Sequence, residues 1–305
     1  MTRSEAERTR GESRYGHSAS RWSFAALLLG NVALAFGPWL VRLADTGAVA
    51  AGFWRLALAI PFLWVLASVT GQKPRVPRRA VLVAIVLAAL FYSADLALWN
   101  IGIRLTKLGN ATLFGNFASF GFAAWGLWLA RRWPTPLQAG ALILAAVGSA
   151  LLMAGSYELS ARYLRGDVLT LMAGLLYTGY LIFVERARSE LQPLPLLLLA
   201  TAFSALLLLP ISITLGERVW PNDWTPLLIF ALSSQVIGQG LLVYALGVMP
   251  PLVVGLALLT QPAIGALIGW LAYGEMLSPL DWIGAVAIGA ALVLVRLRPS
   301  AGAAT

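Results

Sequence analysis

Two ionisable side chains, Arg55 and Asp95, lie inside hydrophobic stretches of this 305-residue chain. Burying a charged residue at the centre of a membrane helix costs roughly 2.5–3.5 kcal/mol on insertion scales. At about 1.5 Å per residue, both lie about 10–12 Å below the same expected membrane face. They fall on consecutive antiparallel spans, so we expect that they can face each other as an ion pair. Arg55 could instead extend to the interface or cap a helix, whereas the short side chain of Asp95 suits proton coupling or recognition of a cationic group.

Side-chain amides supply the next set of polar groups within apolar stretches. Gln235 and Gln239 are four residues apart, which places them on one face of a helix. Gln261 precedes Pro262, and a proline within a helix frees backbone hydrogen-bonding groups beside it. Asn31 begins a small polar and aromatic stripe on the first span. Such amides can bind a polar solute, or they can join helices through hydrogen bonds worth about 0.6 kcal/mol each on average.

Aromatic residues accompany these amides at helical spacing. Their faces suit flat or cationic solutes, although tryptophan and tyrosine near helix ends also form the interfacial belt of membrane proteins. Asn116, next to a glycine, is a further pore candidate. The candidate substrate-binding residues are Asn31, Asp95, Trp99, Asn100, Asn116, Tyr177, Gln235, Gln239, Tyr244 and Gln261.

The composition predicts a membrane protein and excludes several kinds of chemistry. Hydrophobic residues make up 59% of the chain and charged residues 11%, against roughly 25% charged in soluble domains. Cysteine is absent and His17 is the single histidine, in the polar N-terminal tail. Thiolate nucleophiles and histidine or cysteine metal sites are therefore excluded from the spans. No glycine-rich phosphate loop with lysine occurs, so we expect neither an enzyme nor a bound cofactor or metal.

Ten hydrophobic stretches follow a polar tail at residues 1–21, which we expect to be disordered and cytoplasmic. Each is long enough to cross a bilayer or nearly so. We place the spans at 22–41, 48–69, 80–103, 106–130, 134–154, 166–185, 194–215, 226–248, 251–274 and 280–296. The ninth holds Thr260-Gln261-Pro262 at its centre, which predicts an interrupted helix that lines a cavity.

Basic residues set the orientation of these spans. With the N-terminus inside, the cytoplasmic segments carry fifteen Lys and Arg residues and the outer segments carry six. This asymmetry follows the positive-inside rule and predicts that both termini are cytoplasmic, in a bacterial inner (plasma) membrane. The net charge of +9 is therefore a topology signal, and it needs no nucleic-acid partner.

The two halves of the chain can be aligned at an offset of 144 residues. The spacing from Gly126 to Gly140 matches that from Trp270 to Gly284. The halves comprise residues 22–154 and 166–298, with five spans each. Because five is odd, the second copy is inverted in the membrane, as in many secondary transporters with a binding site between repeats.

Several short segments resemble the EamA-type transporters of the drug/metabolite transporter superfamily. They are Phe53-Trp54-Arg55, Asn100-Ile101-Gly102-Ile103-Arg104, Ala111-Thr112-Leu113-Phe114-Gly115-Asn116, Arg165-Gly166-Asp167, the run from Ser234 to Gly240, Tyr244-Ala245-Leu246, Leu259-Thr260-Gln261-Pro262 and Gly274-Glu275. The resemblance implies an all-α membrane protein with ten helices in two inverted five-helix repeats around a central cavity. The first half departs from the family pattern, with Phe117-Ala118 in place of a proline and Arg131 in place of an acidic residue. The resemblance therefore does not predict a helix break in the fourth span.

The sequence thus predicts a secondary active transporter that exports or exchanges small organic metabolites, such as amino acids or aromatic and cationic compounds. Its expected partners are that solute and the lipid bilayer, and a homodimer is an open option. The shortage of buried cations argues against a phosphate carrier, which needs several Lys or Arg side chains. A passive channel or a non-transporting membrane assembly protein is the alternative.

Overall fold

The computed structural model describes residues 21–72, 77–106, 111, 114–131, 133–154, 161–273 and 278–296. These residues form helices and short turns, with no strand among them. The polar tail, His17, Gly274 and Glu275 lie outside the described residues.

Among the described residues, seven helical segments are long and apolar enough to cross a membrane. They are Trp22–Leu43, Ala48–Val69, Arg79–Leu105, Leu164–Ala187, Pro193–Thr214, Thr225–Leu246 and Pro251–Ile268. Three shorter apolar helices, at Phe117–Leu129, Pro136–Leu152 and Pro279–Val295, coincide with the predicted spans 4, 5 and 10. The all-helical architecture predicted from the hydropathy is therefore confirmed for the described residues, and seven of their helical segments reach full spanning length.

The uninterrupted helices are α4 (Ala48–Val69), α5 (Arg79–Leu105), α8 (Pro136–Ala154), α9 (Leu164–Ala187), α10 (Pro193–Thr214) and α15 (Pro279–Arg296). Proline falls inside two of them, at Pro61 of α4 and Pro210 of α10. Two others, α8 and α15, begin at Pro136 and Pro279, where the missing N–H has no helical partner to lose. The boundaries agree with the predicted spans to within a few residues.

Three further segments are broken into consecutive helices. The first consists of α2 (Arg21–Ala35) and α3 (Gly37–Leu43), and the eighth of α11 (Thr225–Phe230), the π-helix η1 (Ala231–Gln239) and α12 (Gly240–Leu246). The ninth consists of α13 (Pro251–Leu258) and α14 (Thr260–Tyr273). The break in the ninth segment was predicted. It falls at Leu259, ahead of the proline, so that Pro262 occupies the first turn of α14, where it removes no helical hydrogen bond.

The fourth segment also has a turn, although it lacks a proline at the corresponding place. The N–H of Ser119 donates to the carbonyl oxygen of Asn116 (3.0 Å), and α7 (Phe117–Leu129) begins directly after that turn. The indole of Trp99 packs so closely over Gly115 that an added Cβ would lie 2.3 Å from it. The break therefore recurs where the sequence alignment of the halves places Asn116 opposite Thr260.

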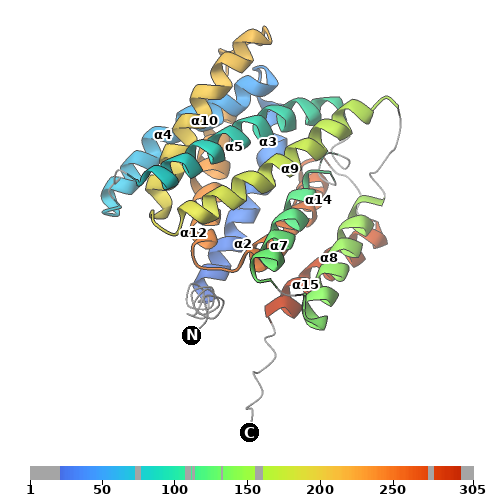
Figure 1. Cartoon of the computed structure of the whole chain (residues 1–305). Helices are drawn as coiled ribbons and strands as arrows, with labels where there is room; N and C mark the ends of the chain where they lie inside the picture. Colours follow the sequence, from blue (N-terminus) through green and yellow to red (C-terminus); the bar gives the residue numbers. More distant parts are fainter. Residues whose placement is uncertain are drawn as a thin grey trace.

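The helices pack as pairs that join the two halves of the chain. Helix α4 pairs with α10, α7 with α13 and α8 with α15, while α5 packs along α9 and α2 along η1 and α12. Figure 1 shows α4 and α10 at one side of the molecule and the α8–α15 pair at the opposite side. The α8–α15 pair packs on the remaining helices mainly through α13 and α14.

Helices α8 and α15 cross at two glycines. A Cβ on Gly148 would lie 2.8 Å from the carbonyl oxygen of Gly284, and a Cβ on Gly284 would lie 2.5 Å from that of Gly148. Only glycine permits this backbone approach, which is the small-residue packing common between membrane helices. We expect Gly148→Leu to destabilise the pair by about 1–3 kcal/mol through overpacking, measured as a fall in the thermal unfolding temperature in detergent.

Gly140, on the same helix, provides the matched control. A Cβ there would meet no atom within 4 Å. Gly140→Leu makes the same change in size and helix propensity, so it should leave the unfolding temperature unchanged or slightly raised. Equal destabilisation by the two substitutions would show that the glycine crossing does not hold the pair together.

Candidate functional site

A buried hydrogen-bonded network joins α4, α5, α10 and η1 in the interior of the bundle. The Arg55 guanidinium donates from Nε to Oε1 of Gln235 (3.1 Å) and from Nη2 to the Tyr92 hydroxyl (2.9 Å). That hydroxyl donates to the same Gln235 oxygen (2.8 Å), and Gln235 Nε2 donates to Thr201 Oγ1 (2.9 Å). All four residues are buried. An internal charge is thus held entirely by neutral polar partners.

A second set of hydrogen bonds continues from this network toward α9. The Tyr180 hydroxyl donates to Oε1 of Gln239 (3.2 Å), and Gln239 Nε2 donates to the Tyr177 hydroxyl (3.0 Å). The ring of Tyr180 stacks on Tyr92 with centroids 4.4 Å apart and on Tyr177 with centroids 5.4 Å apart. The three tyrosines therefore connect the two glutamines through both their rings and their hydroxyls.

Both glutamines project from the π-helix η1. The i→i+5 hydrogen bonding of a π-helix is rare, and it is frequently found at functional sites. Gln235 and Gln239 face the same interior region, as their four-residue spacing predicted. Next to η1, the Phe230 ring lies 4.9 Å from the guanidinium carbon of Arg55 and adds a cation–π contact.

Asp95 lies one turn after Tyr92 on α5 and is 7% exposed. The structure shows no direct ion pair between Asp95 and Arg55, whose guanidinium donates instead to Gln235 and Tyr92. Asp95 accepts no hydrogen bond from any described residue, and Arg55 is the nearby positive charge that acts on it. The interior therefore holds two ionisable side chains, one basic and one acidic, that are not in direct contact.

The other predicted site residues are spread around this network. Asn31 Nδ2 donates to the carbonyl oxygen of Ala257 (2.7 Å) and to Thr260 Oγ1 (3.4 Å), so it bridges α2 to the break between α13 and α14. Tyr244 lies apart from the network, because its hydroxyl hydrogen-bonds Ser23 at the start of α2 (3.2 Å) and 37% of it is exposed.

Three amides and one indole complete the predicted set. Asn100 is fully buried, and neither its amide nitrogen nor its oxygen has a hydrogen-bond partner among the described residues. Asn116 is buried at the turn before α7, and Gln261 is half-buried in the first turn of α14. Trp99 is half-buried against Gly115. The structure does not bring these four side chains into hydrogen-bonding contact with the network.

The sequence reasoning did not identify Thr201, which the network uses. Its hydroxyl is the only polar side-chain group between Leu196 and Phe203, so a hydroxyl in an otherwise apolar span was the available signal. Tyr92 and Tyr180, which also belong to the network, were not among the candidate substrate-binding residues either. The tyrosine hydroxyls became recognisable only once the π-helix had placed two amides opposite them.

The loop between α10 and α11 holds one end of the bundle together. The Glu217 carboxylate accepts the N–H groups of Val49 (3.1 Å) and Ala50 (2.8 Å) at the N-terminus of α4. A negative charge is favourable there because of the exposed amides and the helix dipole. The Trp54 indole N–H donates to the carbonyl oxygen of Val219 (2.6 Å). These contacts join the second half of the chain to α4 of the first half at this end of the bundle.

Arg188 holds the opposite end of the bundle. It donates from Nε to the carbonyl oxygen of Val243 (2.9 Å), at the end of α12, and from Nη1 to that of Leu191, in the turn before α10. Burial of the guanidinium lowers the pKa of Arg188 from its ordinary value. The network thus lies between two ends that are each fastened by a charged side chain bound to backbone.

Comparison with known proteins agrees with this architecture. A model of the EamA-like transporter family matches residues 164–297. The match covers the second half of the chain, from the start of α9 to the end of α15. The chain is thus similar to a family of membrane transporters, and its described residues include helices long and apolar enough to span a membrane.

Curated proteins to which the chain is similar include threonine/homoserine exporters. The protein RhtA of Escherichia coli (strain K12) is 29% identical over 211 residues, which cover 67% of this chain and 69% of RhtA. RhtA of Salmonella typhimurium (strain LT2) is 28% identical over the same length. A protein of known crystal structure has the same fold, with a TM-score of 0.71 at 15% identity, over 90% of this chain and 94% of its own.

Proposed function

We propose that this protein is a secondary active exporter of small zwitterionic or cationic metabolites, amino acids foremost, across the inner membrane. The observation that carries the proposal is the buried Arg55–Tyr92–Gln235 network with Asp95 nearby, inside helices of membrane-spanning length. Buried charges within a membrane are costly and usually functional. The relationship to threonine/homoserine exporters supports amino acids as the substrate class.

The two charges suit a zwitterion. The guanidinium of Arg55 can bind a carboxylate through two parallel hydrogen bonds, in bidentate geometry. The carboxylate of Asp95 can accept hydrogen bonds from an ammonium group. Their separation in this structure leaves each without an opposite charge in direct contact. In the proposed binding step, the substrate carboxylate replaces Gln235 and Tyr92 on Arg55, and the freed amide and hydroxyl then bind the solute.

Ten helices in two inverted five-helix repeats, 22–154 and 166–298, are the proposed architecture, with both termini cytoplasmic. The packing supports it, because contacts recur when the halves are exchanged. Helix α5 packs on α9 as η1 and α12 pack on α2, and α7 packs on α9 as α14 packs on α2. The turns at Asn116 and Leu259 also fall at equivalent places. Alternating access then rocks the halves about the network and releases the Glu217 contacts, which join the two halves, when that end of the bundle opens.

Counterflow in proteoliposomes tests this function. Vesicles loaded with threonine, homoserine or a mixed metabolite extract should exchange labelled substrate across the membrane, with uptake that saturates as the external concentration rises. A carrier produces this exchange because a substrate molecule bound on one side of the membrane allows the binding site to reorient to the other side, where it can bind labelled substrate. Flux that does not saturate would support the passive channel instead, and no flux above empty liposomes, with folded protein confirmed, would support a non-transporting assembly protein.

A further inference from the structure

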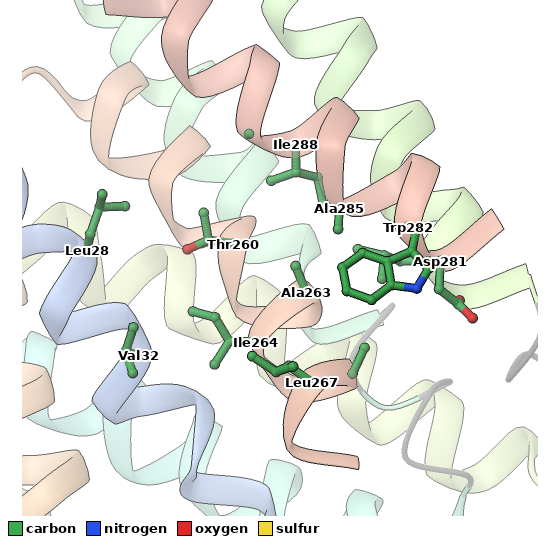
Figure 2. A pocket seen from close by; sticks show the side chains of 13 residues that line it. Leu28, Val32, Thr260, Ala263, Ile264, Leu267, Asp281, Trp282, Ala285 and Ile288 are labelled. Carbon is green, nitrogen blue, oxygen red and sulfur yellow. The ribbon is translucent and has the colours of Figure 1, made fainter. Parts of the chain in front are cut away.

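A groove lies apart from the buried network, between α2, α14 and α15. Its volume is about 390 Å³. Figure 2 shows Leu28 and Val32 of α2 on one side, Ala263, Ile264 and Leu267 of α14 at the centre, and Trp282, Ala285 and Ile288 of α15 on the other side. Leu152 of α8 and Gly289 of α15 also contribute to the lining. The walls are thus almost wholly apolar.

The two polar residues of the lining have partners within the protein. Thr260 Oγ1 donates to the carbonyl oxygen of Ala257 (2.7 Å) and accepts from Asn31 (3.4 Å). Asp281 Oδ2 accepts from the backbone N–H and the hydroxyl of Ser278 (2.7 Å each), as the cap of α15. A polar solute would therefore find few free hydrogen-bonding groups in the groove, which separates it from the proposed substrate site.

The groove follows a seam in the helix packing. The α8–α15 pair packs on the remaining helices mainly through α13 and α14, and the groove lies where α15 and α2 flank α14. Val32, Leu267 and Trp282 of its lining are 38%, 41% and 53% exposed. Because α2 and α14 belong to membrane-spanning segments, these side chains face the hydrocarbon core of the bilayer.

We propose that this groove binds an acyl chain of a bilayer phospholipid and retains it. A chain seated there contacts α2, α14 and α15 together, which supplies dispersion contacts that an unfilled seam lacks. Trp282 lies in the first turn of α15, beside the cap at Ser278, where an indole suits the interface between hydrocarbon and headgroups. The chain thereby fastens α14, the helix after the break at Leu259, to the α8–α15 pair.

Native mass spectrometry of the protein purified in mild detergent tests the proposal. The full-length chain should keep bound phospholipid, whereas Ala263→Phe and Ala285→Phe, which fill the groove, should keep about tenfold less, the change that a loss of about 1.4 kcal/mol of binding free energy produces. Ala290→Phe is the matched control. Ala290 is exposed on the same helix as Ala285 but does not line the groove, so its substitution should leave retained lipid unchanged.

Photo-crosslinking of lipid to the wild-type protein is a second test, and it does not require that any variant folds. Wild-type protein in palmitoyl-oleoyl phosphatidylethanolamine vesicles is irradiated with a small fraction of phospholipid that carries a photoreactive acyl chain. We expect crosslinks on α14 and α15 at groove residues well above those at Ala290. Even labelling of groove and control positions, or equal lipid retention by filled variants and wild type, would overturn the proposal. So would conversion of a dimer to a monomer by the filled variants, because a second copy would then occupy the groove.

Discussion

Gln235→Leu is expected to abolish transport and to destabilise the protein. Leucine has a similar size, but it removes the acceptor of Arg55 Nε and of the Tyr92 hydroxyl and the donor to Thr201. Hydrogen bonds to charged groups are worth about 1.5–3 kcal/mol, and an unsatisfied buried partner adds its own desolvation cost. The loss of unfolding free energy in detergent should lie in that range, and counterflow should fall to the level of empty liposomes.

Ser233→Ala tests whether any change of polarity in η1 has the same effect. The Ser233 hydroxyl donates only to the carbonyl oxygen of Ile229, one turn earlier, at an exposed position. Transport and stability should therefore remain at wild-type values. If Gln235→Leu kept full counterflow while its stability fell, the network would be a structural element of the bundle, and the proposed substrate site would have to lie elsewhere.

The fold followed from hydropathy because lipid imposes a simple rule. A spanning segment must satisfy its backbone internally, so apolar stretches of sufficient length become helices. The α4 and α5 boundaries therefore fall within two residues of the prediction. Pro262 likewise indicated the break in the ninth segment. The turn at Asn116 had no such marker, and the packing of Trp99 over Gly115 is a tertiary contact that the local sequence does not reveal.

The residue types of the candidate site could be predicted from the sequence, but the hydrogen-bond partners of each residue could be predicted less well. Burial cost drew attention to Arg55 and Asp95, and helical spacing placed Gln235 and Gln239 on one face. The actual partner of Arg55 depends on the Tyr92 hydroxyl, which competes with Asp95 from one turn away on the same helix. Which side chain binds Arg55 depends on side-chain geometry and on the wider turn of the π-helix η1. The periodicity of the sequence predicts neither of these.

Asp95→Asn is expected to remove the pH dependence of transport while protein levels stay unchanged. If one proton is exchanged per substrate molecule, each pH unit across the membrane is worth about 1.4 kcal/mol and changes the accumulation ratio about tenfold. The substrate should accumulate on the acidic side, because the proton runs in the opposite direction. The substituted amide has nearly the same shape as the carboxyl group but cannot carry the proton, so the accumulation ratio should become independent of the pH step in liposomes.

Asp223→Asn is the matched control for this prediction. Asp223 is exposed in the loop before α11, where a hydrogen bond from the backbone N–H of Thr225 lowers the pKa of its carboxyl. It stays ionised over the tested range, so its substitution should preserve the full response to pH. If Asp95→Asn kept that response and only raised the KM for zwitterionic substrates, Asp95 would bind the ammonium group and the proton would travel by another route. The charged and titratable neighbours of Asp95 on the described helices are Arg55, Tyr92, Tyr177 and Tyr180. The same assay on Tyr92→Phe would show whether that route uses the Tyr92 hydroxyl.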